Sequence, residues 1–113
     1  MSAGTYNITL EQGALFYRTF TLVDRYNQAL DLTDVVEARA MIRRHATQKE
    51  PTAVFTMAIA SPETGKFTMS MDNQTTATVP AQPHKYDVEF EYSDGRVHRI
   101  IAGEVDVRPN ITR

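Results

Sequence analysis

Apolar and polar residues alternate without interruption over residues 86–92. In a strand, such alternation separates a buried face from a solvated one, as in an antiparallel sheet with one buried side. The inward set is Tyr86, Val88, Phe90 and Tyr92, and the outward set is Asp87, Glu89 and Glu91. Ser93-Asp94-Gly95-Arg96 follows, and its Asp-Gly pair predicts a tight turn with two positive-φ positions. Residues 86–107 are therefore predicted to form a β-hairpin.

Shorter stretches with strand character occur along the rest of the chain. The predicted strands cover residues 6–10, 14–23, 29–33, 36–43, 55–59, 67–71, 86–92 and 97–107. Residues 36–43 contain good helix formers, but period two separates their polar and apolar residues better than a helical period does, and it places Val36, Ala38, Ala40 and Ile42 on the inner face. Residues 14–23 carry apolar side chains at both parities, which predicts a bulge or burial on both faces.

Three further local features are predicted. Asp72 is expected to cap a short helical turn that runs through Ala77, and Val79 is expected to enter the core. Gly103 interrupts the last strand and is expected to mark a bulge. In the first strand, Tyr6, Ile8 and Leu10 are expected to point inward.

About eight short strands and one helical turn predict an all-β fold, with a small barrel as the alternative to a β-sandwich. Tyr86 stands at the start of a late strand, where immunoglobulin-like domains place the tyrosine corner. We therefore expect an immunoglobulin-like antiparallel β-sandwich of about seven to nine strands. With 113 residues, the chain is predicted to be one domain over 1–113, in which residues 1–5 and 109–113 are flexible or partner-bound ends.

Composition and charge narrow the classes of partner. The net charge of −2 argues against a nucleic-acid partner, because such surfaces need clustered Lys and Arg. No apolar run approaches the roughly 20 residues of a membrane span, and the first residues do not form a secretory signal. Since the chain has no cysteine, it has neither disulfides nor thiolate metal ligands.

The sequence predicts no catalytic residue, no cofactor site and no metal site. His45, His84 and His98 are too far apart in sequence for a paired metal motif, and lone histidines are mostly solvated. No serine stands in a nucleophile-elbow context. The acidic row at 87, 89 and 91 matches calcium or acid-base chemistry less well than it matches the wet face of a strand.

Apolar residues near the ends and at the odd positions of residues 14–23 have no obvious inner face, which is typical of a protein interface. A basic cluster around Arg39, Arg43 and Arg44 could dock an acidic neighbour or form a solvated strand face. The candidate protein-interface residues are Tyr6, Ile8, Leu15, Tyr17, Arg39, Arg43 and Ile111.

Motifs near both ends of the chain resemble a family of small tailed-bacteriophage virion proteins, and also the N-terminal domain of phage upper baseplate proteins. The motifs are Ile8–Ala14, Arg18–Thr21, Leu30–Thr33, Ala38–Arg43, Tyr86–Glu89, Asp94–Val97, Gly103–Val107 and Pro109–Arg113. The resemblance implies an immunoglobulin-like virion component of the tail, baseplate, fibre-attachment or head-to-tail region, and it carries over no catalytic residue. One departure is Gln82-Pro83-His84-Lys85, where the family commonly has glycine and small residues.

We therefore expect a non-enzymatic virion structural protein, made in the bacterial cytoplasm, that bridges other virion proteins, attaches fibres and assembles with itself in a ring. The alternative is a carbohydrate- or receptor-binding module on the virion surface, for which Tyr17, Tyr26 and Tyr92 would form an aromatic platform. A hydrolase is the third and weakest hypothesis, because nothing in the sequence supplies an activated group.

Overall fold

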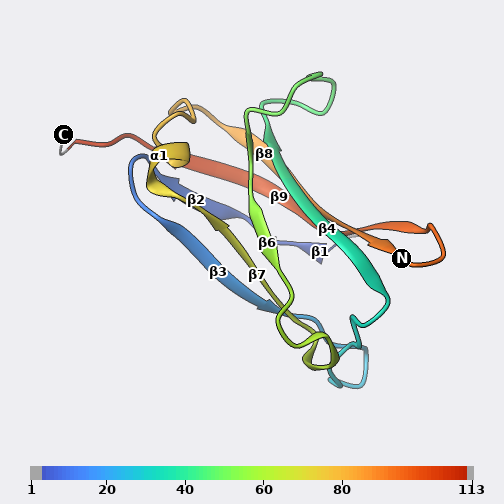
Figure 1. The fold of residues 1–113 in the computed structure, drawn as a ribbon. Helices are drawn as coiled ribbons and strands as arrows, with labels where there is room; N and C mark the ends of the chain where they lie inside the picture. Colours follow the sequence, from blue (N-terminus) through green and yellow to red (C-terminus); the bar gives the residue numbers. More distant parts are fainter. Residues whose placement is uncertain (1–3, 112–113) are drawn as a thin grey trace.

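Two β-sheets pack face to face in the computed structural model, which describes residues 4–111 (Figure 1). The strands are β1 (Gly4–Thr5), β2 (Ile8–Glu11), β3 (Phe16–Thr21), β4 (Val35–Arg43), β5 (Ala53–Val54), β6 (Thr56–Ala58), β7 (Lys66–Met71), β8 (His84–Tyr92) and β9 (Val97–Arg108). Sheet A has the order β1-β9-β8-β4-β5, with β2 also pairing with β9, and sheet B has the order β3-β7-β6. The predicted all-β sandwich is confirmed.

The strand order follows a known pattern. We count β1 and β2 as one interrupted first strand. In sheet A, β4, β8 and β9 then correspond to strands C, F and G of immunoglobulin domains, and in sheet B, β3, β7 and β6 correspond to strands B, E and D. One pairing departs from the antiparallel prediction, because β1 and β2 run parallel to β9. Gly4 and Thr5, which the sequence assigns to a terminal end, belong to this ladder.

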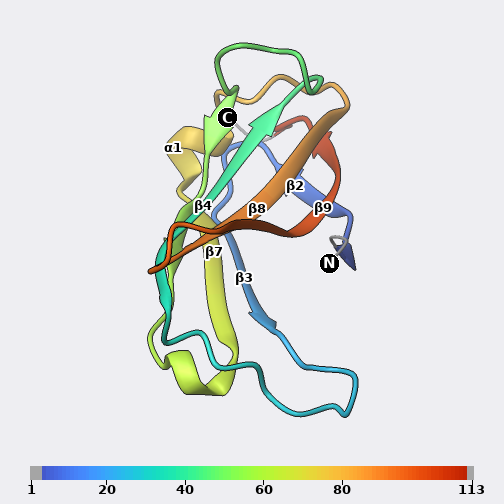
Figure 2. The ribbon, with the colours of Figure 1, turned by 90° about the vertical axis from the view of Figure 1, so that its right-hand side faces the viewer.

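The chain passes between the two sheets at both sides of the sandwich (Figure 2). On one side, β5 pairs with β4 of sheet A and β6 pairs with β7 of sheet B. Phe55, between them, is buried and donates its N–H to Ala40 O at 2.9 Å. On the other side, β2 leaves sheet A and β3 enters sheet B through a turn at Gln12 and Gly13.

The β8–β9 hairpin forms as predicted, but its turn differs in detail. Only Gly95 has a positive φ, of 91°. Asp94 acts instead through its carboxylate, which accepts the N–H of Arg96 at 3.0 Å. Tyr92 accepts the N–H of Gly95 and donates its own to Arg96 O. This is the three-residue loop with a left-handed glycine, so the prediction of two positive-φ positions is wrong.

Residues 36–43 lie in a strand, as predicted; β4 begins one residue earlier, at Val35, and contains a bulge. The register with β8 shifts between Val35 and Glu37, which leaves Val36 as the extra residue. Val35 consequently packs against the core, whereas Val36 is exposed. The prediction that Val36 faces inward is therefore wrong.

The β3 strand pairs with β7 in unbroken register over all six residues, so the predicted bulge is absent from it. Its two faces are not both buried either. Phe16 and Phe20 turn toward the core, while Leu15 and Tyr17 are exposed. The mixed apolar pattern of this segment therefore reflects apolar side chains in solvent.

The core lies between the sheets, and stacked or edge-to-face aromatic rings connect them. Phe67 of β7 stacks on Phe20 at 5.1 Å between centroids and meets Phe90 of β8 edge-on at 5.3 Å. Met69 and Met71 of β7 are buried, and Val79 is buried as predicted. The buried apolar residues are Ile8, Leu10, Phe16, Leu32, Ala40, Ile42, Ala53, Phe55, Phe67, Met69, Met71, Val79, Tyr86, Val88, Phe90, Ile101, Val105 and Val107.

Two short helical segments lie in the β7–β8 and β6–β7 connections. The predicted helical turn forms as α1 (Asn73–Thr76), and the Asp72 carboxylate accepts the N–H of Thr75 at 2.7 Å. A 3-10 turn over Pro62–Thr64 reverses the chain before β7 and ends at Gly65, whose φ is 70°.

Candidate interaction surfaces

The N-terminal ladder is held by a contact that sequence reasoning missed. The Tyr86 hydroxyl donates to the carbonyl of Tyr6 at 2.5 Å, and burial raises the pKa of Tyr86, so this phenol remains a donor. Gly103 lies directly opposite Tyr86 in the sheet. A Cβ at Gly103 would lie only 2.7 Å from Tyr6 C. The glycine therefore permits close approach of two backbones. It does not mark the bulge expected there, because the bulge in β9 falls at Ile100.

This arrangement also differs from a tyrosine corner. In immunoglobulin domains the corner tyrosine bonds to backbone a few residues upstream. Tyr86 reaches Tyr6, 80 positions away. The signal available in the sequence was a glycine within a strand, which predicts close backbone approach as well as bulges.

A second set of hydrogen bonds joins the turn between β2 and β3 to α1 and to the segment after β9. Gln12 donates to Val79 O at 2.7 Å and accepts the N–H of Asn110 at 3.2 Å. The Thr76 hydroxyl, which is buried, accepts the N–H of Gly13 and donates to Ala14 O at 2.9 Å. Because Ile111 follows Asn110 and is 90% exposed, an exposed apolar side chain emerges beside this corner.

One of the predicted interface residues lies in the core, and the others lie in three separate regions of the surface. Ile8 is in the core, so its assignment to an interface is wrong. Leu15 and Tyr17 are exposed at the start of β3, near the corner that holds Asn110. Tyr6 is partly exposed between β1 and β2, where its ring meets Phe20 edge-on at 5.2 Å. Arg39 and Arg43 lie on β4 in sheet A.

Arg39 is not available as a free cation. Its guanidinium contacts Glu37 and Glu91 at 3.1 Å and Glu89 at 3.2 Å. Hydrogen bonds to Glu91, which has the larger effect, and to Glu89 raise the pKa of Arg39. The acids of the row at 87, 89 and 91 are likewise engaged, because Asp87 pairs with Arg99 at 3.0 Å. Residues 4–111 contain no cluster of three His, Asp or Glu side chains arranged for a metal ion.

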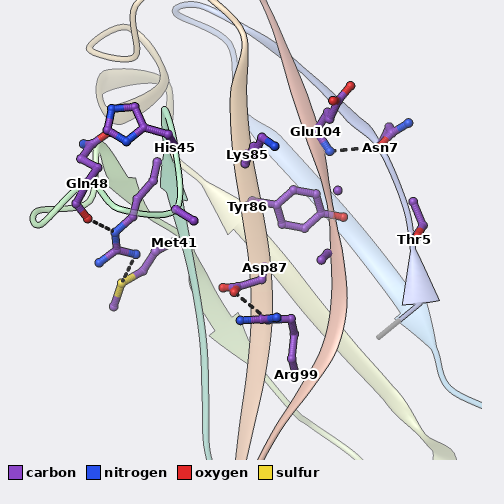
Figure 3. A pocket seen from close by; sticks show the side chains of 14 residues that line it. Thr5, Asn7, Met41, His45, Gln48, Lys85, Tyr86, Asp87, Arg99 and Glu104 are labelled. Carbon is purple, nitrogen blue, oxygen red and sulfur yellow. Dashed lines mark hydrogen bonds and ion pairs between the residues drawn. The ribbon is translucent and has the colours of Figure 1, made fainter. Parts of the chain in front are cut away.

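A hollow of about 710 Å³ opens on the outer face of sheet A (Figure 3). Lys85 and Asp87 of β8 lie at its floor, the β4 side carries Arg43 and His45, and Thr5 and Asn7 form the opposite rim. The guanidinium of Arg43 is oriented by the Gln48 carbonyl, which accepts from Nε at 3.0 Å. The hollow is therefore lined by both polar and apolar groups, with Arg43 and His45 on its β4 side.

His84 departs from the prediction that lone histidines are mostly solvated. His84 is 2% exposed, and its Nδ1–H donates to Gln82 O at 2.6 Å. The statement that lone histidines are solvated therefore does not hold at this position.

The three tyrosines of the predicted aromatic platform do not form one. Tyr17 stands near the start of β3, and Tyr26 stands in the turn beyond its end. Six residues of strand span about 20 Å, so a strand's length separates the two rings. Tyr92 packs against the core and meets His98 edge-on at 5.5 Å.

No known protein-family model matches the sequence, and no curated protein matches it either. None of the helices within residues 4–111 has the length and apolar character needed to cross a membrane. The surfaces themselves are therefore the basis for a functional conclusion.

Proposed function

We propose that the chain is a non-enzymatic structural protein of a tailed-bacteriophage particle, where it bridges neighbouring virion proteins or attaches fibres in the tail, baseplate or head-to-tail region. The resemblance of its terminal motifs to small virion proteins supports the phage origin. The free edge of β3 supports the bridging role, and it is the observation that carries the proposal.

The direction of the backbone groups on β3 follows from its pairing. Leu22, just after β3, donates its N–H to Gly65 O at 2.8 Å, on the β7 side. Because backbone groups alternate sides along a strand, the N–H and C=O groups of Tyr17 and Thr19 point away from β7. Within the described chain, β3 ends its sheet on that side.

Such an edge can accept an extended segment of a neighbouring protein as one more strand. The backbone supplies hydrogen bonds without regard to sequence, and exposed side chains beside the edge supply apolar contact. Leu15 and Tyr17, 67% and 56% exposed, provide that contact here. Adhesion by strand addition requires no catalytic group.

Two experiments test the proposal. Mass spectrometry of purified particles should detect the wild-type chain, and its absence from them would exclude a virion role. Thr19→Pro removes one outward N–H while leaving the β7 ladder intact, and Thr19→Ala keeps that N–H as the matched control. We expect the proline variant to fold, by circular dichroism, but to be lost from particles; equal incorporation of both variants would refute the role of the β3 edge.

A further inference from the structure

The outer face of sheet A carries its charges in order along the strands. The register places residues in four rows across β4, β8 and β9. The rows are Glu37, Glu91 and Val97; Arg39, Glu89 and Arg99; Met41, Asp87 and Ala102; and Arg43, Lys85 and Glu104. The first row is acidic, and the two arginines of the second row form the four ion pairs described above. The last row carries two cations, with His45 beside it.

The cations at the basic end are free to contact another molecule. Neither Arg43 nor Lys85 forms an ion pair with any residue between 4 and 111. At the other end, Arg39 can neutralise only one of its three acidic partners. Glu37, Glu89 and Glu91 together with Arg39 give the acidic end a net charge of −2, whereas Arg43 and Lys85 together with Glu104 give the basic end a net charge of +1.

The same face exposes apolar side chains. Val36, Val54 and Val97 are three of the large apolar residues that the described chain leaves in solvent. Val36 is there because of the β4 bulge, and Val54 is there because β5 pairs with β4 beside Met41. Apolar residues among complementary charges are typical of a surface that another protein covers.

We propose that this face binds a second copy of the chain, with the two copies related by a two-fold axis that runs across the strands between the middle rows. Each β8 then faces the partner's β8 in the opposite direction, so Glu91 of each copy meets Lys85 of the other. On β4, Glu37 meets Arg43 in the same way. An axis along the strands would instead place the acidic rows against each other. In the first orientation the acids that face each other are Glu89 and the other copy's Asp87, and each of these is already paired with an arginine of its own chain. Charge therefore favours the first orientation.

The size of the surface sets the strength of the contact. Four strands about 4.8 Å apart, over about eight residues, give roughly 500 Å² a copy and 1,000 Å² for the pair. This area is at the lower limit for specific association, so the dimer is reversible. The hollow beside Lys85 receives the acidic side chains of the partner. The dimer does not depend on a phage origin or on the β3 edge.

Sedimentation velocity over a concentration series tests the contact. We expect the wild type to form a dimer that high salt weakens. Lys85→Glu should raise its dissociation constant at least about tenfold, since one substitution turns two symmetric attractions into repulsions. Lys66→Glu, the same change on the exposed face of β7, is the control and should leave it unchanged. A monomeric wild type, or equal effects of both variants, would overturn the proposal.

Charge exchange provides the second test. Glu91→Lys alone should also weaken the dimer, whereas a mixture of Lys85→Glu and Glu91→Lys chains should form a heterodimer in which both contacts are attractive again. The double variant, with both changes in one chain, should recover the homodimer, which also shows that both substitutions are compatible with folding. If neither combination restores association, the predicted pairing of residues 85 and 91 is wrong.

Discussion

Replacing Gly103 with alanine tests the most constrained contact in the fold. The added Cβ would stand 2.7 Å from Tyr6 C and 3.1 Å from Asn7 Oδ1, so the N-terminal ladder must move away from β9. That movement disrupts three hydrogen bonds: Tyr6 N–H to Ala102 O at 3.0 Å, Glu104 N–H to Asn7 Oδ1 at 3.0 Å, and the Tyr86 hydroxyl to Tyr6 O. Each is worth about 1 kcal/mol net.

Their sum is about 3 kcal/mol, and the lower unfolded-state entropy of alanine offsets roughly 0.4 to 1 kcal/mol of it. Gly103→Ala should therefore lower the free energy of unfolding by about 2 to 3 kcal/mol, as measured by urea denaturation with linear extrapolation. Gly4→Ala is the matched control in the same ladder, because its Cβ would meet only Ile100 O, at the ordinary distance of 3.8 Å. If Gly103→Ala is as stable as that control, the close approach does not constrain this position.

Three further changes test other parts of the fold. Tyr86→Phe should cost about 1 kcal/mol in urea denaturation, because it removes only the bond to Tyr6; an unchanged midpoint would contradict this. Hydrogen bonds from Thr75 hold the pKa of Asp72 below 3.8. Its contribution to stability is therefore present above that value and lost as pH falls through the lower folded-state pKa. Asp72→Asn should show a shallower loss of melting temperature in acid, and identical slopes would refute the cap's role. Phe90→Leu should lower the unfolding free energy by about 1 to 2 kcal/mol through lost contact with Phe67, and equal thermal melts would argue against this packing.

Alternation of apolar and polar residues was enough to predict both a strand and its buried face where the strand has one buried face and no irregularity. Residues 86–92 are such a case, and their inward side chains were predicted correctly. The pattern failed at Val36, where a bulge changes parity, and the bulge expected at Gly103 falls at Ile100, since a bulge depends on the partner strand as well as on local sequence. The parallel pairing of β2 with β9 was also not predicted, because no local signal specifies a partner about 97 residues away.

The candidate surfaces were only partly predictable for the same reason. The exposure of Leu15 and Tyr17 followed from their parity relative to Phe16. The ordered charges of sheet A did not, because Lys85 and Arg43 become neighbours only through the register of β8 on β4. Ile8 shows the opposite error: a terminal position suggested an interface, whereas pairing with Val105 places its side chain in the core.

The parallel pairing of the first and last strands has a mechanical consequence. Gly4 of β1 lies beside Ile101, and Glu11 of β2 lies beside Arg108, so the incoming chain enters at one end of this ladder and the outgoing chain leaves at the other. Tension between those two points acts along the strands, so all the hydrogen bonds between the paired strands bear the load in shear at the same time. An antiparallel terminal pair pulled from one end would instead open rung by rung. The connection between the two ends of this domain is thus built to transmit force along its length.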